Sequence, residues 1–309
     1  VQDKSRSKKT LSTIHMQEGR SIDTVFEIEG GISNYLLSKD GKSIYVITSE
    51  WSKEFKDIED KNSEPMYYEN LPFRFDTRGI IYNKRAHVYK VNIRTKKFTK
   101  IIDGDAKDII SIESMVEGEK GLVLSFDQYN SKGTMLEEKI GAIEGSKIKE
   151  IYSQGSMGNL FYYEDGLHAV GMRKRFDWPT NTTVLKISNT GKVSYKYRSF
   201  DRNIVKAEVN ESILYFLYED SGKTLLRDGT NNIDLINSEV TVKDFAFNNE
   251  KTYVIANSFS NPDEIYELNN SQLTKISKAN EFFTKKVKTW NCQYERIDTG
   301  KSKIDTWGI

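Results

Sequence analysis

Two arginines, Arg74 and Arg78, stand in a stretch whose residue types could bind a carboxylate. They flank Phe75 and Asp76 in the segment PFRFDTRGI, residues 72–80. A guanidinium group can hold a carboxylate through two parallel N–H bonds, which favours arginine for such a contact. We predict that Arg74 and Arg78 form a ligand-binding group. The alternative is ordinary surface ion pairing with Asp76 or neighbouring carboxylates.

A second group of basic and aromatic residues lies in the segment GMRKRFDWPTNTT, residues 171–183. It contains Arg173, Arg175, Phe176 and Trp178. Arginine and large aromatic side chains are enriched at protein interfaces. We predict that this segment docks on a partner, and packing against a neighbouring part of the same chain is the alternative.

The remaining groups that could do chemistry are three histidines and one cysteine. His15, His87 and His168 lie in separate parts of the chain, with no cysteine or carboxylate at metal-ligand spacing. Cys292 is the single cysteine, and nothing beside it in the sequence signals a lowered thiol pKa. The chain contains no Gly-x-Ser-x-Gly and no glycine pattern of a phosphate-binding loop. We therefore expect no catalytic residue, no metal and no cofactor.

The elements that must position these groups are repeated hairpins. In residues 32–50, an Asp40-Gly41 pair joins two alternating apolar and polar runs, a strong hairpin signal because glycine supplies positive φ at no steric cost. Related paired runs recur around turn positions Gly41, Glu119, Gly166, Glu211 and Asn249, separated by 78, 47, 45 and 38 residues. A second kind of paired run fills each interval: residues 88–101, 139–152, 184–197, 224–236 and 264–276, with a further copy at 11–28.

Each repeat thus predicts four antiparallel strands in about 40 to 50 residues, the period of a propeller blade. A β-sandwich, the main competitor, expects no self-similarity at this period. We predict an all-β propeller of six or seven four-stranded blades, in which residues 284–297 would complete the opening half-repeat. The propeller would span residues 1–282, and residues 283–309 would hold the last strands and a linker. The first strands, such as 33–37 and 241–245, should be innermost.

A long insertion, residues 51–87, breaks the first interval and contains both Arg74 and Arg78. Loops of this length inside a compact repeat are usually functional or disordered, and we expect a functional one. The net charge of +1 gives no support for nucleic acid or an anionic membrane as a partner. No apolar run reaches the about 18 residues that cross a bilayer. A lone cysteine favours a reducing, cytoplasmic compartment.

Three segments resemble the acylaminoacyl peptidase-like members of the prolyl oligopeptidase family. Residues 69–101 are similar to the second-blade region of those proteins, including a pattern matched by His87, Val88 and Tyr89. SKDGKSIYVIT resembles their repeated Ser-Pro-Asp-Gly-Lys hairpin, with Lys39 in place of proline. NPDEIYELNNSQLTKISKANEFF, residues 261–283, resembles their last-blade pattern, in which a Pro-x-Glu-Ile-Tyr strand leads to an Asn near the exit.

The final segment, YERIDTGKSKIDTWGI, is similar to the place where such a propeller leads into an α/β-hydrolase domain, with Thr299 where aspartate is usual. The resemblance implies the substrate-gating propeller of a serine peptidase. It would lack catalysis of its own, and its partners would be an α/β-hydrolase domain of the same parent chain and an oligopeptide substrate. Arg74 and Arg78 would then contact substrate, and residues 173–178 would dock on the hydrolase domain. A free-standing scaffold for protein partners is the alternative, and a propeller lactonase is a weaker one.

Overall fold

The computed structural model describes residues 2–3, 11–18, 21–29, 31–56, 65, 67–76, 79–164, 166–174, 180–197, 199–236, 239–248, 251–290 and 292–308. The chain divides into two compact units, which we describe separately. The first comprises Val1–Leu160, Arg173–Asp177 and Ser188–Lys192, and the second comprises Phe161–Met172, Trp178–Ile187 and Val193–Ile309. In the described part of the chain, no helix is both long and apolar enough to cross a membrane.

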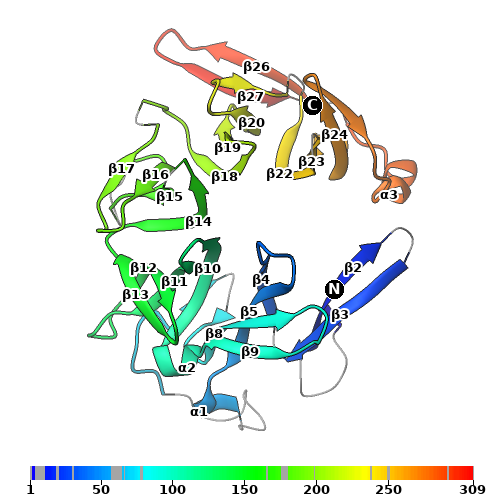
Figure 1. Ribbon diagram of the computed structural model, residues 1–309. Helices are drawn as coiled ribbons and strands as arrows, with labels where there is room; N and C mark the ends of the chain where they lie inside the picture. Colours follow the sequence, from blue (N-terminus) through cyan, green and yellow to red (C-terminus); the bar gives the residue numbers. More distant parts are fainter. Residues whose placement is uncertain are drawn as a thin grey trace. The chain divides into compact units, whose positions relative to one another are not determined.

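The first unit contains two four-stranded antiparallel sheets (Figure 1). Their strands are β4 (Gly31–Leu37), β5 (Ser43–Trp51), β8 (Lys84–Asn92) and β9 (Phe98–Ile102), then β10 (Ile109–Gly118), β11 (Gly121–Tyr129), β12 (Leu136–Glu144) and β13 (Lys147–Tyr152). The opening repeat forms a three-stranded sheet of β1 (Gln2–Asp3), β2 (Leu11–Glu18) and β3 (Ser21–Glu29). The insertion contributes α1 (Lys53–Lys56) and a pair of short strands, β6 (Arg74–Phe75) and β7 (Gly79–Ile80), and α2 (Gly104–Lys107) follows β9.

Three more four-stranded sheets follow, and β14 begins in the first unit while the rest lies in the second. The strands are β14 (Ser156–Tyr163), β15 (Gly166–Met172), β16 (Thr183–Ile187) and β17 (Val193–Tyr195); β18 (Ile204–Asn210), β19 (Ile213–Asp220), β20 (Lys223–Asp228) and β21 (Ile233–Asp234); β22 (Thr241–Asn248), β23 (Lys251–Asn257), β24 (Glu264–Asn269) and β25 (Gln272–Lys275). Helix α3 (Glu281–Lys286) then leads to a hairpin of β26 (Gln293–Asp298) and β27 (Lys303–Gly308).

The predicted repeats are confirmed, and the fold is an all-β propeller. In every four-stranded sheet the strands lie in chain order, so the first strand of each repeat is at one edge. In the opening hairpin, Leu37 pairs with Ile44, and the hydroxyl of Ser38 donates to Asp40 within the connecting turn. The predicted role of residues 284–297 is wrong, because β26 pairs with β27 in a separate two-stranded sheet instead of completing the opening repeat.

Neighbouring sheets bury each other's apolar faces, which explains why the repeats stack. In the first unit, Ile47 and Val88 from one sheet pack in a cluster with Ile112 and Leu124 from the next. The second unit has equivalent clusters, for example one with Leu226 and Val254. Full burial of one such side chain stabilises the fold by about 1.5 to 3 kcal/mol. One sheet alone would leave these faces in water.

The first strand of four sheets carries at least one extra residue opposite its partner. The register of the first strand against the second shifts at Ser33, Val205 and Lys243, and β10 shifts twice, at Ile110 and at Glu113. An extra residue bends a strand and reverses the faces onto which later side chains point. Simple alternation along a first strand therefore does not identify which side chains share a face.

Candidate functional site

The second half of the insertion is held on the first unit by aromatic contacts. The ring of Tyr68 stacks on Phe73 with centroids 4.5 Å apart and meets Tyr82 edge-on at 5.4 Å. The buried hydroxyl of Tyr129 donates to the carbonyl of Pro72 at 2.8 Å. These contacts give the strand pair β6–β7, and hence Arg74, a defined position.

Arg74 is exposed on β6, where it pairs with Ile80 across the short hairpin. Within the described residues, no carboxylate forms an ion pair with Arg74, so the nearby Asp76 does not neutralise it. Arg78 lies outside the described residues, and the predicted two-arginine group stays a prediction. Because successive side chains of a strand point to opposite faces, Arg74 and Phe75 face different ways.

Phe75 lines a small cavity at the ends of two adjacent sheets. The cavity has a volume of about 250 Å³, and three of its walls are the buried side chains of Ile81, Ile110 and Leu136. Its charged group is Lys84, whose ammonium lies 5.7 Å from the centre of the Trp51 ring. The complete lining is Ser49, Phe75, Ile81, Lys84, Ile110, Ser111 and Leu136.

The basic residue next to this cavity has a structural role. Arg85 forms an ion pair with Asp108 at 2.8 Å and donates to the carbonyls of Tyr82 and Lys84. Lys84, in contrast, forms no ion pair within the described part of the chain. Sequence reasoning did not single out Lys84, because the apolar residues around it come from β10 and β12, far along the chain.

The second predicted segment, residues 171–183, connects β15 to β16. The insertion that carries Arg74 likewise connects the second and third strands of its sheet. Arg173 is half-buried, and its carbonyl accepts a hydrogen bond from the hydroxyl of Tyr152. Arg175, Phe176 and Trp178 lie outside the described residues, so the predicted interface stays untested.

His87 has carboxylates close to it that sequence spacing did not reveal. Its Nδ1 lies 3.4 Å from Asp103 Oδ1, and its Nε2 lies 3.8 Å from Glu50 Oε2. Asp105 completes a set of ligand-type atoms within 4.8 Å of one another. These residues converge because β8, β9 and α2 are consecutive, and α2 folds back onto β8.

The arrangement around His87 holds α2 in place and does not fit a metal ion. The backbone N–H of Gly104 donates to Nδ1 at 3.1 Å, so the lone pair of this nitrogen already accepts a hydrogen bond and is not available to a metal ion. The ammonium of Lys100 lies 3.3 Å from the same nitrogen and places a positive charge where a metal cation would have to bind. Burial lowers the pKa of His87, and Lys100 lowers it further while Glu50 opposes the shift.

The other two histidines offer no site among the described residues. His168 is fully buried, its ring lies against Phe161 and Tyr163, and its Nδ1 donates to the carbonyl of Gly166 at 3.0 Å. Burial lowers its pKa. The side chain of His15 is outside the part of the chain whose side chains the structure describes.

The exit from the last sheet is fixed by one buried carboxylate. Glu264 accepts hydrogen bonds from the Ser277 hydroxyl and from the backbone N–H groups of Ala279 and Asn280, and Lys275 lies 3.1 Å away. These contacts, led by Ser277, lower the pKa of Glu264 to about 2. The Pro-x-Glu-Ile-Tyr pattern seen in the sequence thus has a physical role, since its glutamate binds the segment that ends at Asn280.

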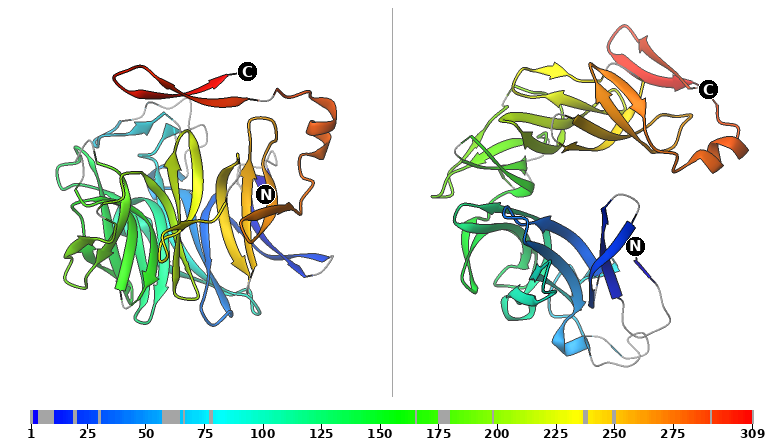
Figure 2. Two further views of the ribbon diagram at one scale, coloured as in Figure 1. Left: turned by 90° about the horizontal axis from the view of Figure 1, so that it is seen from above. Right: turned by 45° about the vertical axis from the view of Figure 1, so that its right-hand side comes forward.

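The hairpin β26–β27 lies at one end of the strands of the second unit (Figure 2). Trp307 packs on Gly222, and Tyr294 lies beneath the ammonium of Lys223, which also pairs with Glu239. The opposite face of the hairpin carries the directly paired Ile297 and Ile304, which are 49% and 51% exposed. The hairpin therefore has one apolar face on the propeller and another apolar pair directed away from it.

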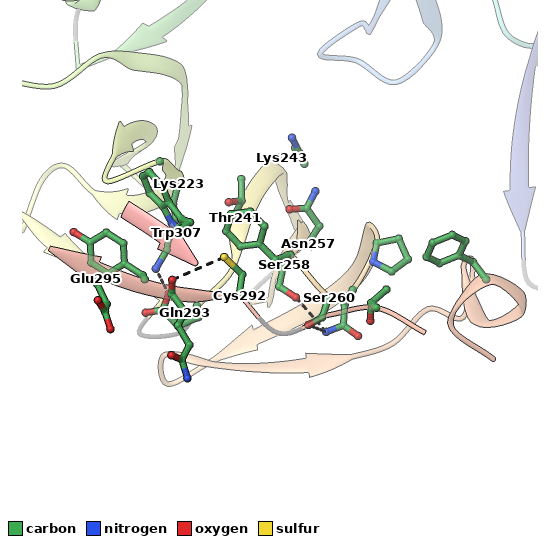
Figure 3. A pocket seen from close by; sticks show the side chains of 18 residues that line it. Lys223, Thr241, Lys243, Asn257, Ser258, Ser260, Cys292, Gln293, Glu295 and Trp307 are labelled. Carbon is green, nitrogen blue, oxygen red and sulfur yellow. Dashed lines mark hydrogen bonds and ion pairs between the residues drawn. The ribbon is translucent and has the colours of Figure 1, made fainter. Parts of the chain in front are cut away.

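An open cleft of about 990 Å³ lies between this hairpin, α3 and the loop from β23 to β24 (Figure 3). Asn257 at the end of β23, Ser258 and Ser260 from the loop, and Gln293 from the hairpin give it a polar lining. Cys292 is part of the wall, and its Sγ contacts the carbonyl of Gln293 at 3.9 Å. The boundary predicted at residues 282 and 283 falls inside α3, which borders this cleft.

Known structures share this architecture. The chain has a β-propeller fold similar to that in solved peptidase structures. The Pyrococcus horikoshii acylaminoacyl peptidase matches with a TM-score of 0.71 and 14% identity over 93% of this chain. An acylaminoacyl peptidase in complex with Z-Gly-Gly-Phe-chloromethyl ketone matches with a TM-score of 0.72 and 14% identity over 97% of this chain. A structure from a study of two prolyl endopeptidases matches with a TM-score of 0.56 and 10% identity over 98% of this chain.

The chain spans less than half the length of these three proteins, covering 45%, 46% and 43% of them. At this level of identity the likeness establishes the fold. No protein-family model and no curated relative matches the sequence.

Proposed function

We propose that this chain is the propeller domain of a serine peptidase of the acylaminoacyl or prolyl oligopeptidase type, and that it limits the active site to short peptides. The observation that carries the proposal is the match over 93% and 97% of this chain to propellers that are each less than half of a peptidase. The order of the family-like segments along the sequence supports it. The chain has no Gly-x-Ser-x-Gly, so the nucleophile would come from the remainder of the parent protein.

The partner in this proposal is an α/β-hydrolase domain of the same parent chain. A two-stranded hairpin is marginally stable in water unless a further layer covers it. One face of β26–β27 rests on the propeller, and the Ile297–Ile304 pair on the other face is half-exposed. A hydrolase domain that packs on this pair would supply the missing layer. Arg173, Arg175, Phe176 and Trp178 would contribute to docking on the same domain.

The gating role follows from sterics. A propeller that covers an active site admits short flexible peptides and excludes folded proteins, because only thin chains pass through the channel or between the domains. Arg74, which has no carboxylate partner in the described part of the chain, would attract a peptide carboxylate, and Arg78 would assist it. A cytoplasmic location is part of the proposal and is supported by the single cysteine.

The full-length parent protein tests the proposal. We expect the coding sequence after Ile309 to contain Gly-x-Ser-x-Gly followed by Asp and His. The full-length protein should react with a fluorophosphonate probe, and it should cleave a short peptide while sparing the same cleavage sequence inserted in a folded protein. A stop codon directly after Ile309 would favour the free-standing scaffold. Equal cleavage of both substrates would contradict the gating role.

The docking face is tested separately with charge substitutions in the full-length protein. Ile304→Arg should weaken the association of the two domains, measured as a lower unfolding temperature of the hydrolase domain and faster proteolysis between the domains. Ile276→Arg is the matched control, because Ile276 is 52% exposed in the same unit and lies outside the hairpin. Identical behaviour of the two variants would remove the hairpin from the interface.

A further inference from the structure

We propose that the cavity lined by Phe75 and Lys84 binds the C-terminal residue of a short peptide, with its apolar side chain inside the cavity and its terminal carboxylate on Lys84. This inference rests on the proposed function for the source of the ligand, a peptide. The binding itself depends on the residues of the cavity. It assigns a specificity-determining role to Lys84 and Phe75.

The volume of the cavity fits one side chain. At about 250 Å³ it is smaller than the roughly 300 to 1,000 Å³ of sites that enclose whole small molecules. Ile81, Ile110 and Leu136 are buried in its walls, so the surface offered to a ligand is aliphatic. Phe75 lines the cavity and is 41% exposed, so part of its ring is open to solvent and available to a ligand.

The charge of the cavity selects an anionic group. Lys84 lines it and has no ion-pair partner within the described residues, while the described lining contains no Asp or Glu. Ser111 Oγ lies 2.5 Å from Asp127 and 3.1 Å from Glu113, two carboxylates that do not line the cavity, so its hydrogen is already engaged and Lys84 is the group left to bind an anion. An ammonium group at the rim of an apolar cavity attracts a carboxylate more strongly than it would in bulk water, because the effective dielectric constant is lower there. An apolar residue with a free carboxylate combines both requirements.

Arg74 is not part of this site. Arg74 does not line the cavity, and strand alternation directs it to the face of β6 opposite Phe75. Lys84 is therefore the cation of this site. The predicted role of Arg74 in contacting substrate elsewhere is independent of it.

Binding of two matched peptides to the 309-residue chain tests the inference by titration calorimetry. Ala-Ala-Leu with a free carboxylate should bind at least about tenfold more tightly than its C-terminal amide, the effect expected for one charge-assisted hydrogen bond. Lys84→Met should abolish this difference while keeping the apolar stem. Phe75→Ala should weaken the binding of both peptides, because it removes an aromatic ring that lines the cavity.

The control is Lys90→Met. Lys90 is on the same strand, is also half-buried and also lies over an aromatic ring, 5.3 Å from that of Tyr45, but it does not line the cavity. The Lys90→Met variant should still bind the peptide with a free carboxylate more tightly than the amide. Circular dichroism and the unfolding temperature check that each variant is folded.

Three results would overturn the inference: no binding of either peptide at millimolar concentration, equal binding of acid and amide, or equal behaviour of the two lysine variants. The outcomes separate this site from the proposed function. If the full-length protein is a peptidase and the acid and amide bind equally, the function stands and the carboxylate site fails. If the acid is preferred and no hydrolase domain follows, the site stands and the function fails.

Discussion

The indole ring of Trp307 lies directly against Gly222, in the turn between β19 and β20. A Cβ atom at Gly222 would lie 2.4 Å from Cζ2 of that ring, closer than any real contact. Lys223 continues the contact, since its ammonium lies 5.6 Å from the centre of the Tyr294 ring. The turn thereby fixes the hairpin β26–β27 on the second unit.

Gly222→Ala should displace the hairpin. The added methyl group collides with Trp307, so the ring or the hairpin must move, and tryptophan fluorescence should shift towards that of an exposed indole. Trp307→Phe identifies the signal among the four tryptophans. Gly41→Ala is the matched control, because φ is +67° at Gly41 and +69° at Gly222, yet nothing lies within 4 Å of a Cβ at Gly41. Both variants should lose about 1 to 2 kcal/mol from the left-handed backbone, and an unchanged spectrum for Gly222→Ala would contradict the contact.

Glu264→Gln should loosen the exit from the last sheet. The amide accepts fewer hydrogen bonds than the carboxylate that holds Ser277, Ala279 and Asn280, so amide hydrogen exchange should accelerate in residues 277–280. Glu267→Gln is the control, since Glu267 pairs with the exposed Lys251 on the same sheet. Unchanged exchange in residues 277–280 would show that the carboxylate is dispensable.

The same carboxylate gives a pH dependence with a defined sign. The pKa of Glu264 is about 2 in the folded chain against an ordinary value of 4.5. The folded state therefore favours the ionised form, and this stabilisation is complete above pH 4.5 and is lost as the pH falls towards 2. The stability difference between wild type and Glu264→Gln, measured by urea unfolding, should shrink over that interval. A constant difference would contradict the prediction.

His87 should make the chain less stable in mild acid. Burial lowers its pKa below the ordinary 6.5, so the unfolded chain binds a proton before the folded chain does. Stability is full above pH 6.5 and falls as the pH drops through that value. Urea unfolding of wild type and His87→Gln between about pH 7.5 and about pH 5 measures this, and wild type should lose stability relative to the variant. Parallel curves would rule out titration of His87 as a cause.

Tyr129→Phe should destabilise the attachment of the insertion. The variant removes the hydroxyl that donates to Pro72 and leaves that carbonyl without this donor, at a cost of about 1 kcal/mol. Tyr35→Phe is the control, because Tyr35 is 61% exposed on an edge strand, and it should change stability by less than about 0.5 kcal/mol. Equal free energies of unfolding for the two variants would contradict the role of Tyr129.

The repeats could be predicted from the sequence because two local signals coincide in each copy: alternating apolar residues and turn residues such as Asp40-Gly41. The face to which each side chain of a first strand points could not be predicted. The extra residues at Ser33 and Lys243 reverse the alternation, and no residue type marks them in the sequence. The position of the insertion on the sheets could not be predicted either, because it depends on the hydrogen bond from Tyr129 to Pro72, which are far apart in the sequence.

The candidate sites depend on contacts that local sequence does not show, for a related physical reason. Arg74 was singled out by the residue types next to it in the chain, and its role stays a prediction. Lys84 and His87 owe their surroundings to residues that come close only after folding, such as Leu136 for Lys84 and Gly104 for His87. Sequence spacing carries no signal of such contacts when the partners lie in other strands or beyond a turn.

The contact of Trp307 with Gly222 has a practical consequence for anyone who prepares the propeller alone. Truncation at residue 282, the boundary that the repeat pattern favours, would cut through α3 and strip the indole from the β19–β20 turn. The shortened protein would expose apolar surface that the hairpin covers in the longer chain, and it would be prone to self-association. Expression should therefore extend through Gly308, so that the turn stays covered.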